Sequence, residues 1–166
     1  MELKEYQQKS LAQVKAYLTA LSKWREKSDQ VVKVAGPEST LDFPLKAWEE
    51  TAKTPYRSRK NGLSEPLPCF CLKIPTGGGK TLLAVKTIDL INTAYRKRQT
   101  GLVLWVVPSS QIYRQTLQGL RDRDHPYRQH LDVASGGRTV ILEKTDRFTP
   151  LDVAENLTVL LLMLPS

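Results

Sequence analysis

The sequence predicts an α/β fold in which a mostly parallel sheet is flanked by helices. Apolar runs alternate with helical patterns from residue 69 onward, and strand–helix–strand alternation is typical of parallel sheets. A glycine-rich segment at residues 77–79 separates the first apolar run from the first of these helical patterns. The 166 residues are enough for one domain with a core.

The first expected strand is the short, mostly apolar run at residues 69–74, which we expect to be buried. A helix over residues 80–98 follows, and Gly101 is expected to end it as the residue after the cap. The second expected strand, residues 102–107, is continuously apolar. Such runs are typical of strands covered on both faces by helices.

Ser109 can cap a further helix that continues to about Leu120, because its hydroxyl can accept a bond from the first turn. Two more strands are expected, at residues 139–142 and 157–164.

The N-terminal region predicts an amphipathic helix from Leu3 to about Trp24. Its apolar positions recur at helical spacing, at Leu11, Val14, Leu18 and Leu21. Prolines and glycines then interrupt residues 28–68, apart from a short helix expected at 45–51 and an exposed basic loop at 56–62.

The chain therefore divides into three segments. We expect an N-terminal helix in residues 1–27, an irregular insertion or linker in 28–68, and an incomplete α/β domain in 69–166.

The composition favours a polyanionic partner. Lysine and arginine total 25 against 17 acidic residues, which gives a net charge of +8 and suits nucleic acid. Cys69 and Cys71 are too few for a disulfide framework or a zinc site. The longest apolar run, residues 159–164, is too short to span a bilayer, and the N-terminus has no apolar signal region. We therefore expect a cytoplasmic protein without a membrane partner.

The glycine-rich segment at residues 75–81, Pro-Thr-Gly-Gly-Gly-Lys-Thr, predicts a phosphate-binding loop. Glycines let the backbone direct its N–H groups toward an anion. The lysine can reach a β- or γ-phosphate, and the threonine hydroxyl can bind Mg²⁺. The predicted ATP-binding residues here are Thr76, Gly77, Gly78, Gly79, Lys80 and Thr81, of which Lys80 and Thr81 are also the predicted catalytic residues.

Gln7 is a candidate for reading adenine, because a glutamine amide matches the donor and acceptor on that base edge. By itself it is also an ordinary polar residue at the start of a helix.

The segment after the second strand is a candidate for contacting a nucleic-acid backbone, because hydroxyls, a helix N-terminus and a guanidinium suit phosphate oxygens. A simple capped helix is the alternative. The predicted nucleic-acid-binding residues are Ser109, Ser110, Gln111, Arg114 and Gln115.

Three segments together resemble the Q motif, motif I and motif Ia of superfamily two helicases: residues 3–7, 75–81 and 107–116. Residues 120–129, 140–144 and 148–150 are similar to the restriction subunit of type III restriction–modification enzymes.

This resemblance implies a motor of two RecA-like domains, with ATP and Mg²⁺ between them and DNA as the substrate. It implies that residues 1–27 carry a Q-motif-like segment and that residues 69–166 are an incomplete RecA-like ATP-binding domain. It implies that Gln7 contacts adenine, Gly77–Gly79 and Lys80 hold phosphates, Thr81 holds Mg²⁺ and the 109–115 segment touches DNA. It also implies a nuclease domain farther along the chain and a methyltransferase subunit as partner.

The sequence lacks the acidic pair that hydrolysis by this class requires. The nearest candidate is Glu143, which Lys144 follows, and we interpret it as an ordinary strand end. We therefore expect an N-terminal fragment of a larger protein that binds nucleotide weakly and does not hydrolyse it efficiently. His125 and His130 are expected to be structural.

Two other functions fit the sequence. One is a phosphate-loop kinase or other ATPase, which would have no affinity for nucleic acid. The other is a non-catalytic nucleic-acid-binding module whose glycine loop grips DNA phosphate instead of a nucleotide.

Overall fold

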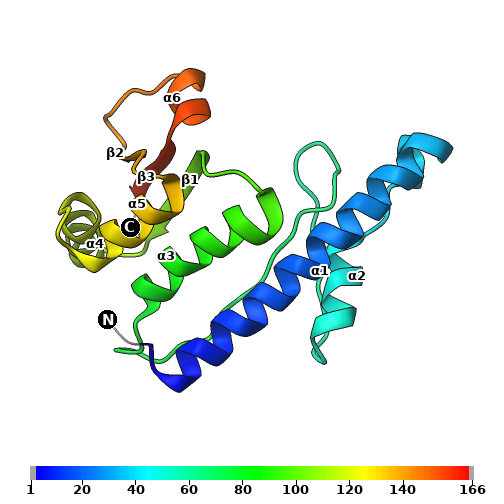
Figure 1. The fold of residues 1–166 in the computed structure, drawn as a ribbon, viewed down its shortest axis with the longest axis horizontal. Helices are drawn as coiled ribbons and strands as arrows, with labels where there is room; N and C mark the ends of the chain where they lie inside the picture. Colours follow the sequence, from blue (N-terminus) through cyan, green and yellow to red (C-terminus); the bar gives the residue numbers. More distant parts are fainter. Residues whose placement is uncertain (1–2, 165–166) are drawn as a thin grey trace. The chain divides into compact units, whose positions relative to one another are not determined.

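The computed structural model describes residues 3–164, which form two compact units (Figure 1). The helical unit contains the described residues up to 75 together with 94–96, and the sheet unit contains residues 76–93 and those from 97 onward. The predicted three-segment division of the chain stays a prediction.

The helical unit is built on α1 (Glu5–Ala35), followed by η1 (Pro37–Ser39) and α2 (Phe43–Thr51). α1 continues well past its expected end near Trp24, to Gly36 at φ 87°, a value that glycine adopts without strain. The expected apolar positions of α1 are all buried. They pack against α2, which buries Phe43, Pro44 and Ala47. The expected short helix is confirmed and begins two residues earlier.

The expected strand at residues 69–74 is wrong. Outside its named strands the described chain has only an isolated bridge between Lys60 and Pro66, and residues 69–74 lie in irregular structure with half-buried and exposed side chains. A strand forms only where a neighbour completes its ladder. Here the backbone N–H of Cys69 donates to the hydroxyl of Tyr56 at 3.1 Å, and Phe70 packs edge-on against Tyr17.

The sheet unit begins with α3, which passes into the π-helical segment η2. Its elements are α3 (Lys80–Leu90), η2 (Ile91–Arg96), β1 (Gly101–Val107), α4 (Ser110–Arg121), α5 (Pro126–Ser135), β2 (Thr139–Glu143), α6 (Pro150–Glu155) and β3 (Leu157–Met163). The three strands are parallel, in the order β1–β3–β2. The expected parallel α/β fold is thus confirmed, and the three strands lie within one residue of the expected bounds.

Gly101 does not end the preceding helix. Lys97 ends it, in the left-handed region at φ 53°, and Gly101 is the first residue of β1 at φ 138°. Its positive φ still requires glycine, so the residue type was informative although its expected role was wrong.

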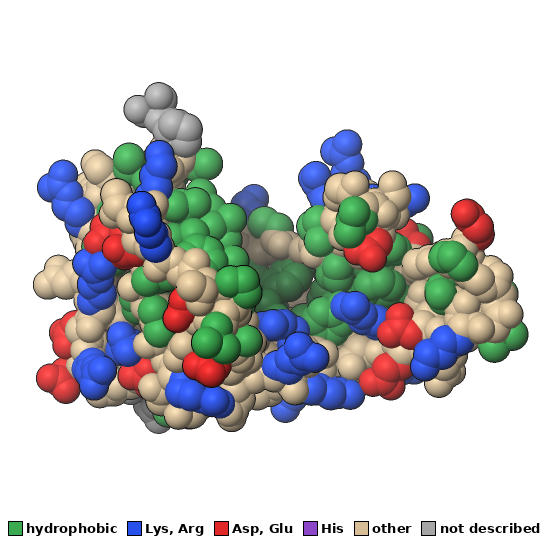
Figure 2. All heavy atoms as spheres, turned by 90° about the horizontal axis from the view of Figure 1, so that it is seen from above, with side chains coloured by type: hydrophobic (Ala, Val, Ile, Leu, Met, Phe, Trp, Pro, Cys, Tyr) green, Lys and Arg blue, Asp and Glu red, His purple; other side chains and the backbone are tan. Residues whose placement is uncertain are grey.

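The core of the sheet unit joins helices to one face of the sheet. Val85 of α3, Leu120 of α4 and Leu131 of α5 are buried against Leu157 and Val159 of β3. On β1 the alternate residues Leu102, Leu104 and Val106 face away from this core and are 45%, 58% and 45% exposed. The expectation that β1 is covered on both faces is therefore not met within the part of the chain that the structure describes. Figure 2 shows patches of hydrophobic side chains on the surface of the molecule as seen from above.

Among residues 3–164, every helix is too short or too polar to cross a membrane.

Candidate functional site

The glycine segment turns sharply before α3. Gly77 and Gly79 have φ values of 75° and 78°, in the left-handed region that costs other residues about 1–2 kcal/mol. Gly78 between them is buried, whereas Thr76 and Gly77 are exposed. The loop is therefore bent, as a phosphate-binding loop must be, and only glycine adopts two of its backbone conformations without strain.

The N-terminus of α3 presents its first-turn amides to the loop. Gly79 is the N-cap and makes no side-chain cap bond, and the N–H of Leu83 donates to the carbonyl of Gly79 at 3.0 Å. The amides of Thr81 and Leu82 precede that bond, in the part of a helix where N–H groups have no intrahelical acceptor. Together with the helix dipole they form an arrangement suited to an anion.

The loop residues fit a nucleotide phosphate. A Cβ added at Gly77 would meet no atom within 4 Å, so the exposed side of the loop is open. Lys80 is exposed and Thr81 half-buried. Within residues 3–164, no group of three or more histidine, cysteine or acidic side chains is placed to hold a metal ion. Thr81 would therefore supply one Mg²⁺ ligand and not a complete site.

The second predicted segment begins α4 directly after β1. Ser109 caps the helix, since its hydroxyl accepts a bond from the N–H of Ile112 at 3.4 Å. The helix thus starts at the carboxyl end of a parallel strand, where α/β sheets bind their ligands. The other four predicted nucleic-acid-binding residues, Ser110, Gln111, Arg114 and Gln115, are exposed.

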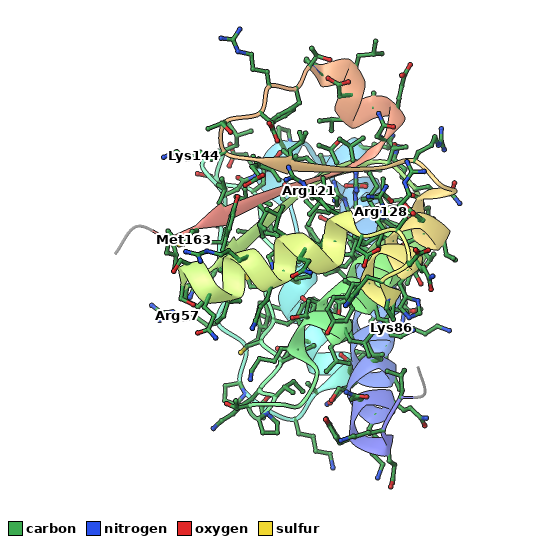
Figure 3. The ribbon with its side chains drawn as sticks, turned by 90° about the vertical axis from the view of Figure 1, so that its left-hand side faces the viewer. Arg57, Lys86, Arg121, Arg128, Lys144 and Met163 are labelled. Atoms are coloured by element: carbon green, nitrogen blue, oxygen red, sulfur yellow. The ribbon has the colours of Figure 1, made fainter. Side chains whose placement is uncertain are left out.

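A polar network ties α4 to the end of β2. The hydroxyl of Tyr113 donates to Glu143 Oε2 at 2.8 Å, and Arg121 pairs with Glu143 Oε1 at 2.8 Å. Asp146 accepts the N–H of Glu143 at 2.8 Å. Burial and the bond to Glu143 raise the pKa of Tyr113. Both carboxylate oxygens of Glu143 therefore bond to side chains of α4, which supports the interpretation of Glu143 as a strand end. Figure 3 shows Arg121 beside the strands.

Gln7 lies in the helical unit and is 5% exposed. Its amide oxygen accepts the N–H of Lys4 at 2.9 Å, as the third residue of a capping box does. The structure therefore gives Gln7 a helix-capping role, and its contact with adenine stays a prediction.

In a comparison with known proteins, residues 1–149 match the family model described as "Type III restriction enzyme, res subunit". The chain belongs to this family. No curated protein and no solved structure matches it. The match covers the glycine segment and the 109–115 segment, and the parallel α/β sheet agrees with the helicase type of this family.

In this Res-family chain the two histidines have structural surroundings. His125 caps α5, because its Nδ1 accepts the N–H of Tyr127 at 3.2 Å. Burial, and next the charge of Lys86, lower the pKa of His130, while Asp89 opposes the shift. Neither histidine has a nucleophile bonded to it among the described hydrogen bonds.

Sequence reasoning missed Arg128, which is 8% exposed and labelled in Figure 3. Its guanidinium donates to the carbonyls of Leu120 at 3.4 Å and Thr139 at 3.1 Å, and its Nε donates to Asp132 at 2.9 Å. It thus joins the end of α4 to the start of β2. The signal present in the sequence was the i,i+4 spacing of Arg128 and Asp132. This spacing did not reveal the buried role of Arg128, because exposed ion pairs on helices have the same spacing.

Proposed function

We propose that this chain is the nucleotide-binding and DNA-contacting part of an ATP-dependent helicase or translocase, the restriction subunit of a type III restriction endonuclease. One observation carries the proposal. In a chain of the Res family, two glycines with positive φ lead into a helix N-terminus, and the second of them is the N-cap residue.

The proposed roles follow from this geometry. The amides of Gly77–Gly79 and of the first turn of α3 would bind phosphate oxygens, and the exposed ammonium of Lys80 would pair with the β- or γ-phosphate. The hydroxyl of Thr81 would be a Mg²⁺ ligand. Bound ATP and Mg²⁺ supply the phosphoryl group and the charge neutralisation that drive such motors.

DNA is the proposed second ligand. Ser110, Gln111, Arg114 and Gln115 offer donors at the exposed start of α4, a position that suits backbone phosphates and carries no sequence readout. The network through Glu143 would hold α4 in place during this contact. A methyltransferase subunit is the proposed protein partner, as for type III enzymes.

Nucleotide binding tests the first half of the proposal. Titration with a fluorescent ATP analogue in the presence of Mg²⁺ should show affinity at least about tenfold weaker for Lys80→Ala, because a charge-assisted contact is lost. Lys86→Ala, on the same helix, is the matched control and should bind as the unchanged chain does. If no variant and no wild-type protein bind nucleotide, the non-catalytic module is the better interpretation.

DNA binding tests the second half. Arg114→Gln should weaken binding to a labelled oligonucleotide and make its salt dependence shallower, because one phosphate contact fewer releases fewer counterions. Arg123→Gln removes an exposed arginine just beyond α4 and is the control. Nucleotide binding without any salt-sensitive DNA binding would favour the kinase or other ATPase.

A further inference from the structure

The helical unit contains a cavity of about 550 Å³ between α1, α2 and residues 70–72. This volume falls in the range of small-ligand sites. Three aromatic rings line it. The ring of Tyr17 stands edge-on to Trp48, with centroids 5.5 Å apart, and to Phe70, with centroids 5.8 Å apart.

The aromatic walls are held in place. The indole N–H of Trp48 donates to the carbonyl of Thr54 at 2.6 Å, and Tyr56 lies against the same indole at 5.5 Å. Burial raises the pKa of Tyr17 far above its usual value, so this wall carries no charge. Fixed, uncharged rings are surfaces on which a planar base can stack.

The segment that borders the cavity is strongly basic. Lys53 lines the cavity, and the exposed Arg57, Arg59 and Lys60 follow it, with no acidic residue between 51 and 64. Figure 3 shows Arg57 projecting outward.

The nearest carboxylates of α2 are already paired. Glu50 pairs with Lys23 at 3.0 Å, and Glu49 pairs with Lys46 at 3.2 Å. Glu65, next to the Lys60–Pro66 bridge, accepts a bond from the amide of Asn61 at 2.7 Å. The described ion pairs include none of the cations of residues 53–60, so these cations can contact an external anion.

We propose that the helical unit binds single-stranded DNA by taking one base into the cavity lined by Trp48 and Phe70, while Lys53, Arg57, Arg59 and Lys60 contact the adjoining phosphates. A purely apolar ligand would not use these cations. A mononucleotide would use only one or two of them, whereas a strand presents a charge at every nucleotide. The inference deepens the proposed DNA-binding function by adding a base-binding site outside α4.

Filling the cavity is the first test. Ala52 lines it, and Ala52→Leu should weaken binding of a labelled oligothymidylate of roughly a dozen nucleotides about tenfold, since stacking of the base is lost. Ala35→Leu, at the exposed end of α1, is the size-matched control and should bind normally. Circular dichroism and thermal unfolding check that both variants fold. Unchanged affinity of folded Ala52→Leu overturns the proposal.

A second test needs no change in the cavity wall. Cys71 lines the cavity and is exposed, so in a Cys69→Ser background its alkylation by a maleimide reports access to the site. Saturating oligothymidylate should slow this alkylation several-fold. Equal rates with and without the strand overturn the proposal, as does equal protection by thymidine monophosphate at the same concentration or by duplex DNA.

Charge removal is the third test. Lys53→Gln with Lys60→Gln should make the slope of log affinity against log salt shallower by about 1.4, from two lost contacts to a single strand. The control is Lys15→Gln with Lys33→Gln, two exposed lysines of α1, which should leave the slope unchanged. An equal change in both pairs would show a diffuse charge effect and overturn the assignment.

Failure here is distinguishable from failure of the proposed function. Arg114→Gln weakens strand binding if α4 contacts DNA but leaves Cys71 protected at saturation. Ala52→Leu leaves the effect of Arg114→Gln and the affinity for ATP unchanged.

Discussion

Two helices of the sheet unit begin at predicted ligand-binding segments, and their N-termini differ in how they are capped. α4 begins with Ser109, whose own hydroxyl satisfies the N–H of Ile112. α3 begins with Gly79, which has no side chain, lies at φ 78° and makes no side-chain cap bond. The first turn of α4 is thus partly satisfied by the side chain of its own N-cap residue, whereas the N-cap residue of α3 has no side chain that could do the same.

The difference separates a helix start that its own N-cap side chain stabilises from one whose N-cap position has no side chain. Serine is among the residues that stabilise a helix start most, and glycine contributes less. At the start of α3 the N-cap residue is Gly79, which has no capping side chain and whose backbone conformation only glycine adopts easily. The first two predictions below test this contrast and the next two test how α4 and α3 are held in the sheet unit, from the largest expected effect to the smallest.

Gly79→Val should have the largest effect. A β-branched side chain at φ 78° is strained and would place carbon beside the first-turn amides of α3. We expect nucleotide affinity to fall roughly tenfold or more, measured by titration with a fluorescent ATP analogue. Gly62→Val is the control, because Gly62 has no positive φ and no neighbour within 4 Å of an added Cβ. If Gly79→Val binds nucleotide normally, the contrast between the two helix ends has no functional meaning.

Ser109→Ala should lower stability without affecting nucleotide binding. Removing the cap of α4 should lower the free energy of unfolding by about 1 kcal/mol, measured by urea denaturation, while the affinity for ATP is unchanged. Ser110→Ala tests the neighbouring hydroxyl, which does not cap the helix. A loss of ATP affinity on Ser109→Ala would contradict the separation of the two ends.

Glu143→Gln should have a smaller effect on stability, roughly 0.5 kcal/mol, because the pair with Arg121 is partly exposed. The loss should shrink in high salt. It should also lower the pKa of Tyr113 toward its ordinary value, since the negative charge beside the phenol is removed. Spectrophotometric titration of tyrosine measures this, with Glu155→Gln as control, and an unchanged Tyr113 would contradict the network.

The smallest effect concerns pH. The pKa of His130 is lowered from 6.5 in the folded chain, so the unfolded state binds more protons just below that pH. The free energy of unfolding should therefore decline as pH falls from about 7 through 6.5 and below. His130→Gln should remove this part of the decline. Lys86→Gln should raise the pKa of His130, measured by NMR titration, and an unshifted histidine would contradict the packing of α3 beside α5.

Local signals predicted most of the fold. Helical spacing placed Leu11, Val14, Leu18 and Leu21 in the core, and all four are buried. The apolar runs predicted β1, β2 and β3 within a residue of their bounds. The glycine triplet predicted a bend, and the bend is present. Each of these signals resides in a few neighbouring residues, because helix periodicity, strand runs and glycine turns are properties of the local backbone.

Other features depended on residues far apart in the chain. The sequence alone determined that residues 69–74 are mostly apolar, but whether they pair as a strand depended on a neighbouring strand. In the structure the N–H of Cys69 donates to the hydroxyl of Tyr56 instead. The sequence likewise shows an acidic residue at position 143, but only the tertiary structure brought Arg121 and Tyr113 to it. Only the tertiary structure, too, assembled the cavity from α1, α2 and residues 70–72. The physical reason is that a strand ladder, an ion pair and a cavity wall each need a partner at large sequence separation, which no local pattern specifies.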